Sequence, residues 1–308
     1  MKIQFGKRLW LIAGMLLVCG CGAAATVAAT TARSAARKVD PTAIPLGDGK
    51  VSTTPKVGYV DSCTTNFRQG GAEHAGPWIQ RNTWDSVTKP AVEGAVSWPS
   101  ARFKARKSHG RRVVSFNDLP TDHTTGVFPI SSSDPAYAYD RNPNQIVAHS
   151  TTWKLPLHPK KARKPSCTSL GPIGVLKDGV LLFNGLDAAG RDAAAHEVQD
   201  SCDGHPDGAG EYHNHDIPSC VLAKTRKGRS TLVGYALDGY GIYVQKNKHG
   251  KLPTDASLDA CHGKTSKVRW NGKTRRIYHY VATLEYPYTV GCFHGTPIAV
   301  SRVRGPNP

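Results

Sequence analysis

The fold class is decided by the stretch VRWNGKTRRIYHYV at residues 268–281. Runs rich in β-branched and aromatic residues flank Asn271-Gly272, and an Asn-Gly pair in this setting is the strongest short-range signal for a β-hairpin. Asp-Gly pairs at 178–179 and 238–239 lie between further apolar runs and predict two more hairpins, over 175–183 and 231–244. We therefore expect a fold built from short strands joined by tight turns.

Helical signals are few by comparison, and only residues 188–199 predict a helix. The 308 residues include 31 Gly and 21 Pro but only 2 Met, which points away from helical bundles. A hydrophobic content of 39% excludes a wholly disordered chain. The predicted fold is mainly β with one or two short helices, sandwich-like or barrel-like, with long ordered loops. Weaker strands are expected at 78–84, 92–98 and 113–116.

The first residues have the layout of an export signal. Lys7 and Arg8 precede an apolar run at 9–18, and small residues follow it. The sequence VCGC at 18–21 resembles a bacterial lipobox, so Cys21 is a candidate for lipid attachment. Cleavage in the Ala-rich stretch at 23–25 and an uncleaved membrane anchor are the alternatives. All three place the rest of the chain outside the cytoplasm, and membrane contact is expected only through this signal or its lipid.

The six cysteines beyond the signal predict three disulfides, because an even number in an exported chain is the pattern of a disulfide framework. Sequence proximity favours Cys202–Cys220 and Cys261–Cys292, which leaves Cys63–Cys167. The last bond would tie the two halves of the chain together. We therefore expect an export signal over 1–25, a flexible tether over 26–56, a single domain over 57–302 and a tail over 303–308.

The charge is strongly positive, with 40 Lys and Arg against 23 Asp and Glu. Basic runs such as 104–107 and 160–164 contain no interleaved aromatic residues and belong to no recognisable reading helix, so specific nucleic-acid binding is not expected. A solvated surface explains such charge most simply. An anionic envelope polymer is the next candidate partner.

Histidine carries the strongest functional signal. His213 and His215 alternate in a strand-like segment and would share one face, and His205 lies on a Gly-flanked loop shortly before them. Grouped imidazoles are typical ligands of zinc and copper. His279 is the expected fourth ligand. The residues expected nearby as hydrogen-bond partners or acid–base groups are Asp238, Tyr212, Tyr278, His196 and Glu197. Each feature also has a plain structural reading: an exposed polar strand face for the histidines, a turn for Asp238 and strand packing for the tyrosines.

Several short stretches of the chain form an ordered series of motifs: GVLKDGV (174–180), DAAGRD (187–192), HE (196–197), DSCDGHP (200–206), YHNH (212–215), LDG (237–239), YHY (278–280) and YPYTVGC (286–292). At these residues the chain resembles the YHYH domain family, and looser similarity extends over about residues 57–302. The resemblance implies an exported bacterial protein, commonly a lipoprotein, and carries no established activity. Asn214 stands at the third position of the motif, where it would point away from His213 and His215, and Val281 stands where some relatives have His.

Three functions follow as hypotheses. The first is an envelope domain that binds zinc or copper through His205, His213 and His215, with His279 or Asp238 completing the site, as a metal-binding protein or as a metal-dependent enzyme acting on an unknown small molecule. The second is a non-catalytic surface module that binds an anionic glycan or envelope polymer through basic patches. The third, a metal-free hydrolase using Asp238 or Glu197, has no nucleophile motif to support it.

Overall fold

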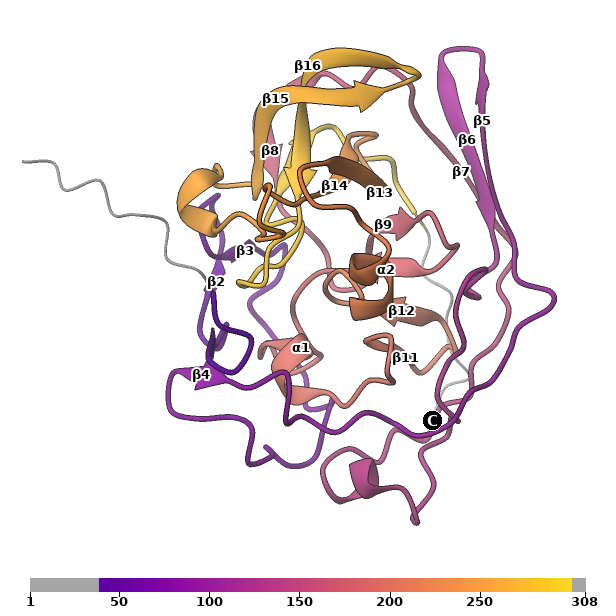
Figure 1. Cartoon of the computed structure of the whole chain (residues 1–308), viewed down its shortest axis with the longest axis vertical. Coiled ribbons are helices and arrows are strands. Elements are labelled where there is room, and N and C mark those ends of the chain that lie inside the picture. The colour runs from indigo at the N-terminus through magenta and orange to yellow at the C-terminus, as the bar shows by residue number, and fades with distance from the viewer. Residues whose placement is uncertain (1–38, 301–308) are drawn as a thin grey trace, which may run out of the picture. The chain divides into compact units, whose positions relative to one another are not determined.

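A computed structural model describes residues 39–300 of the chain (Figure 1). The prediction of a mainly β fold is confirmed, and the largest element is a mixed sheet of eight strands. In Figure 1 its strands follow one another from β15 and β16 at the top down to β11. In spatial order they are β11 (Gly204–Pro206), β12 (Tyr212–Asn214), β10 (Leu181–Phe183), β9 (Pro172–Leu176), β13 (Ser230–Ala236), β14 (Gly241–Gln245), β16 (Lys273–Val281) and β15 (Gly263–Trp270).

The strand order of this sheet divides into two similar halves. In the first half β9 and β10 form a hairpin, and β12 pairs parallel with β10 and antiparallel with β11. In the second half β13 and β14 form a hairpin, and β16 pairs parallel with β14 and antiparallel with β15. Because β9 and β13 pair antiparallel at the centre, an approximate two-fold axis relates the halves.

Local turn chemistry explains the hairpins. Gly179 and Gly239 follow an aspartate in the β9–β10 and β13–β14 turns and adopt φ of +97° and +85°, a region that glycine enters without steric cost. Asn271 and Gly272 also have positive φ and join β15 to β16. All three hairpins predicted from sequence are therefore confirmed.

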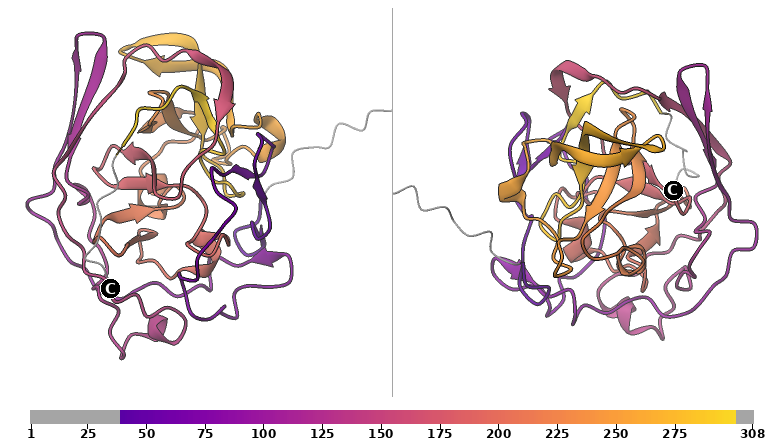
Figure 2. Two further views of the ribbon diagram at one scale, coloured as in Figure 1. Left: turned by 180° about the vertical axis from the view of Figure 1, so that it is seen from behind. Right: turned by 45° about the horizontal axis from the view of Figure 1, so that its top comes forward.

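A three-stranded antiparallel sheet packs against the eight-stranded one and closes the main hydrophobic core (Figure 2). Its strands are β5 (Phe103–Ser108), β6 (Arg111–Phe116) and β7 (Thr151–Pro156). Val114, Phe116 and Leu155 contribute fully buried side chains to this core. The Arg112 guanidinium lies over the rings of both Tyr235 and Trp270, which fixes this sheet to β13 and β15.

A second core lies beside α1 (Ala193–His196) and is rich in aromatic residues. Trp78 donates from Nε1 to the carbonyl of Ala195 at 2.8 Å, and Tyr286 packs nearby. The remaining elements are the strand pairs β1 (Ile44–Pro45) with β4 (Thr83–Trp84), β2 (Val51–Ser52) with β3 (Val60–Asp61) and β8 (Lys161–Ser166) with β17 (Phe293–Gly295), the helix α2 (Ser219–Ala223), and 3-10 turns at Pro135–Ala138 and Asp255–Ser257.

Several local predictions need correction. The helix expected at 188–199 is only the single turn of α1, because Gly190 has φ of +78° and Glu197 is already extended. Residues 78–84 and 92–98 form only β4 and isolated bridges, since Gly94 at φ +116° interrupts the second run. The tether was expected over 26–56, but its described part, 39–56, carries β1 and β2.

The disulfides are as predicted: Cys63–Cys167, Cys202–Cys220 and Cys261–Cys292. Within residues 39–300 no helix is long and apolar enough to cross a membrane. The predicted export signal, the lipidation candidate Cys21 and the whole of the predicted tail lie outside the described residues.

Candidate metal centre

Strand pairing brings three histidines together at one edge of the eight-stranded sheet. The antiparallel register of β11 and β12 places His205 directly opposite His213, and His215 follows two residues later on the same face. The centroids of the His205 and His213 rings are 4.5 Å apart, and those of His213 and His215 are 4.9 Å apart. One ring nitrogen from each residue lies within 4.8 Å of the other two, and all three side chains are buried.

The opposite face of β12 anchors this arrangement. Tyr212 donates its hydroxyl to Asp200 at 2.8 Å, and Asn214 donates from Nδ2 to the carbonyl of Cys202 at 3.0 Å. Tyr212 was expected near the metal, but the alternation of the strand turns it away from the histidines. Its ring also requires Gly204, because a Cβ there would lie 2.2 Å from the phenol. These contacts fix the register of β11 against β12.

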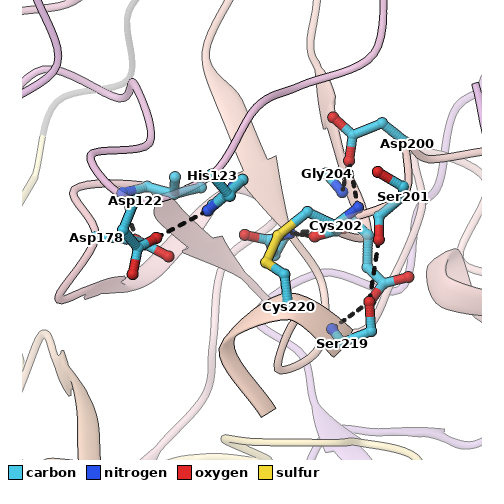
Figure 3. The surroundings of a disulfide bond; sticks show 12 residues. Asp122, His123, Asp178, Asp200, Ser201, Cys202, Gly204, Ser219 and Cys220 are labelled. Carbon is cyan, nitrogen blue, oxygen red and sulfur yellow. Dashed lines mark hydrogen bonds and ion pairs between the residues drawn. A yellow bond between two sulfur atoms is a disulfide. The ribbon is translucent and has the colours of Figure 1, made fainter. Parts of the chain in front are cut away.

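The Cys202–Cys220 disulfide ties the loop before β11 to α2 (Figure 3). Asp200 Oδ1 accepts the backbone N–H groups of Cys202 and Gly204, and the Ser219 hydroxyl donates to the carbonyl of Ser201. The loop that delivers His205 is therefore held by a covalent bond, by two buried hydrogen bonds to Asp200 and by an exposed one from Ser219.

Hydrogen bonding defines the protonation of two imidazoles. The Nδ1 atom of His213 lies 2.9 Å from the carbonyl oxygen of Glu211, and Nδ1 of His215 contacts the carbonyl oxygen of Asn184. A carbonyl oxygen can only accept, so both Nδ1 atoms carry the proton. In the neutral rings both Nε2 atoms then present lone pairs, and these two atoms face each other at 3.1 Å. Such a pair is stable only with a proton or a metal cation between the nitrogens.

Glu197 is the accessory candidate that the structure does bring to this centre. Its Oε2 lies 3.2 Å from Nε2 of His215 and 3.4 Å from Nε2 of His205, without hydrogen-bond geometry to either. Both ring nitrogens of His205 are buried and have no hydrogen-bond partner among the described residues. Buried polar atoms without partners are rare in proteins, and these two nitrogens are therefore available as ligands.

Burial controls the electrostatics of the cluster. It lowers the pKa of His205 and of His213 well below the ordinary value, with a further contribution from neighbouring histidines. Burial acts in the same direction on His215, but the carboxylate of Glu197 outweighs it and raises the pKa of His215 above the ordinary value. His205 and His213 are therefore neutral, as metal ligands must be.

The cluster opens into a cavity of about 320 Å³. Phe183 lines it and stacks on His213, with ring centroids 3.8 Å apart. In a basic chain the cavity is unusual, because its described lining contains six carboxylates and no Lys or Arg. The acidic lining residues are Glu73, Asp140, Asp187, Glu197, Asp207 and Glu211.

The expectation that His279 completes the site is wrong. His279 lies on β16, which is five positions from β12 in the sheet, a separation on the order of 24 Å at about 4.8 Å per strand. Its Nε2 faces the amide nitrogen of Gln245 at 2.9 Å. Sequence order alone could not show that the two His-bearing strands lie in different halves of one sheet.

The other accessory candidates also lie away from the three histidines. Asp238 accepts hydrogen bonds from the Tyr280 hydroxyl at 2.6 Å and from the Gly295 amide, so it is a structural residue of the second half. His196 places Nε2 2.9 Å from Oδ2 of Asp48. Tyr278 donates to Asp259 at 3.1 Å.

A second group of potential ligands lies beside the disulfide in Figure 3 and consists of Asp122, His123 and Asp178. The ammonium of Lys224 lies 2.8 Å from Oδ2 of Asp122 and already supplies a positive charge there. This group is therefore a weaker metal site than the three histidines.

The position of His279 is explained by an internal repeat that the sequence does contain. DSCDG at 200–204 recurs as DACHG at 259–263. Asp259 accepts the amides of Cys261 and Gly263 just as Asp200 accepts those of Cys202 and Gly204. Tyr278 bonds Asp259 as Tyr212 bonds Asp200, so His279 is the counterpart of His213.

Comparison with known proteins gives a match for the part of the chain that contains the three clustered histidines. Residues 152–251 match the YHYH protein family. The resemblance seen in the sequence is thereby confirmed over this segment, which contains β8 to β14 and all three clustered histidines. The YHYH match ends before β15 and β16, and therefore before His279. No curated protein and no solved structure matches the chain.

Proposed function

We propose that this protein binds a divalent transition metal, zinc or copper, through His205, His213 and His215. The observation that carries the proposal is the pair of opposed Nε2 atoms of His213 and His215, 3.1 Å apart with both Nδ1 protons committed to carbonyls. Two nitrogens bound to one tetrahedral zinc are about 3.3 Å apart, given Zn–N bonds of about 2.0–2.1 Å. The backbone carbonyls would act as the outer contacts that orient metal-binding imidazoles.

A proton is the competing occupant. An imidazolium at His215 would be balanced by Glu197 and could donate to Nε2 of His213. It would leave His205 buried with both ring nitrogens unpartnered. A metal ion gives all three imidazoles a ligand bond, which favours the metal.

The surroundings support a reaction class as well as binding. Zinc held by three imidazoles keeps an open coordination position and activates water for hydrolysis. Glu197 lines the same cavity and lies beside two of the three ligands, where its carboxylate can accept a proton. The cavity volume of about 320 Å³ suits a small molecule. We therefore propose metal-assisted hydrolysis of a small substrate as the activity to test.

We propose that the protein is located outside the cytoplasm. Three disulfides are typical of proteins outside the cytoplasm, and they agree with an export signal at the N-terminus. Lipid attachment at Cys21 is part of the proposal. Mass spectrometry of the membrane fraction would test it through the lipid mass on the N-terminal peptide.

Elemental analysis of untagged protein tests the metal directly. Wild type should carry one equivalent of metal after incubation with zinc and removal of excess, and His213→Ala/His215→Ala should carry none. His279→Ala is a matched control, because it removes a buried histidine from the equivalent place in the other half. Absence of metal in the wild type, or full occupancy in the double variant, would refute the proposal.

A further inference from the structure

The second half of the sheet repeats the framework around His205 and His213 with different side chains. Lys264 lies opposite His279 in the β15–β16 register, as His205 lies opposite His213 in the first half. Val281 lies two residues after His279, the place that His215 takes after His213. The ring of His279 still donates from Nδ1 to the carbonyl two residues before it, as His213 does.

His279, the counterpart of His213 in this half, already has a partner for each ring nitrogen. Its Nε2 faces the side-chain nitrogen of Gln245 at 2.9 Å, which can only donate, and so the lone pair of His279 already has a partner. Gln245 follows the Asp-Gly turn at the same distance as Gly185 does in the first half, where no side chain intervenes. The contacts of His279 therefore leave no free lone pair on its ring for a metal.

A basic cavity opens at this position instead. Its volume is about 1080 Å³, and Lys264 and Gln245 both line it. The described lining contains no Asp or Glu, the reverse of the cavity over the three histidines. The cationic lining residues are Arg229, Lys246, Lys248, Lys251 and Lys264.

Lys264 and Lys246 are the two partly buried cations of this lining, and the other three are exposed. Lys246 is tied to the protein, since its ammonium donates to the carbonyls of Leu222 and Thr225. Lys264 has neither a hydrogen bond nor an ion pair from its side chain within residues 39–300. A partly buried ammonium without a counter-charge is costly, and an anion would offset that cost.

We propose that the second half is a diverged copy of the metal-binding half, and that its cavity takes an anionic group, a phosphate or a carboxylate, at Lys264. The basic patch considered in the sequence analysis is thereby assigned to this cavity, with Lys264 as its central residue. The proposal rests on the repeat and on the cavity lining, and not on metal binding in the first half.

Calorimetric titration of the full chain with inorganic phosphate and with glucuronate tests the site. Lys264→Gln/Lys251→Gln should weaken binding by about tenfold or more, as expected for loss of charged hydrogen bonds. The matched control is Lys104→Gln/Arg106→Gln, which removes the same charge from the basic strand β5 and should leave the affinity unchanged. Binding should also weaken with added salt.

The outcomes separate the sources and the proposals. Tighter binding of phosphate indicates a phosphorylated ligand, and tighter binding of glucuronate indicates an acidic sugar. Because phosphate can also ligate a metal, the titrations are repeated on His213→Ala/His215→Ala, in which the affinity should persist. Absence of binding by both anions, equal losses in the two charge-removal pairs, or loss only in the histidine variant would overturn the anion site.

Discussion

The Nε2 atoms of His213 and His215 face each other at 3.1 Å, while a backbone carbonyl accepts the proton of each Nδ1. Neither ring can turn away without breaking a buried hydrogen bond. The strand therefore holds two lone pairs against each other, which is unfavourable unless a cation lies between them. His205 approaches the same point from the neighbouring strand.

Removal of His205 should weaken metal binding without unfolding the protein. His205→Ala leaves two imidazoles, and we expect the zinc affinity to fall by about a hundredfold or more, because the loss of even an outer contact typically costs 10–100-fold. Competition with a chromophoric chelator measures this change. An unaltered affinity would show that His205 is only a packing residue, and His279→Ala serves again as the control.

The two repeated tyrosines provide a matched pair for separating stability from metal binding. Tyr212→Phe and Tyr278→Phe each remove a buried hydroxyl that bonds an aspartate, so each should cost about 1–3 kcal/mol of unfolding free energy. Only Tyr212→Phe should also weaken zinc binding, since it loosens β12 beneath the histidines. Urea unfolding and chelator competition on both variants test the prediction. It would be contradicted if Tyr278→Phe reduced zinc affinity equally.

Asp118 should make stability depend on pH. Both of its carboxylate oxygens are buried without a hydrogen-bond partner among the described residues, and burial raises its pKa from 3.8 to about 8. Between these values the folded state keeps a proton that the unfolded state has released, so stability should fall as pH rises from about 4 to about 8, by up to about 1.4 kcal/mol per unit.

Asp118→Asn tests this dependence. Asparagine keeps the shape of the side chain, tolerates the φ of +59° and carries no charge. The unfolding free energy of the variant should therefore decline less between pH 5 and pH 8 than that of the wild type. Glu93→Gln, at an exposed position, is the control. Parallel curves for the wild type and Asp118→Asn in urea unfolding at several pH values would contradict the assignment.

Features that are set by residues close together in the chain could be predicted from the sequence, and the order of the strands could not. The Asp-Gly and Asn-Gly turns, and the shared face of His213 and His215, depend on neighbours along the chain and were predictable. His279 was misplaced because the alternation of side chains along a strand does not give the order of the strands in the sheet. In that order β12 and β16 are separated by four other strands. The repeat of DSCDG as DACHG carried that information, since it shows that His279 belongs to a second copy of the framework.

If the two halves share one framework, a second metal site can be restored by substitution. Lys264→His and Val281→His supply the two missing imidazoles around His279, and Gln245→Ala removes the amide that now faces its Nε2. In the His213→Ala/His215→Ala background, the triple substitution should return metal content from none to one equivalent, measured by mass spectrometry of the untagged protein. Val281 is fully buried, so circular dichroism must show that the variant folds. The variant Lys264→His/Gln245→Ala leaves Val281 intact and is a second test. It offers only two imidazoles, so weaker metal binding is expected. Folded variants of both kinds that bind no metal would show that the halves resemble each other in topology alone.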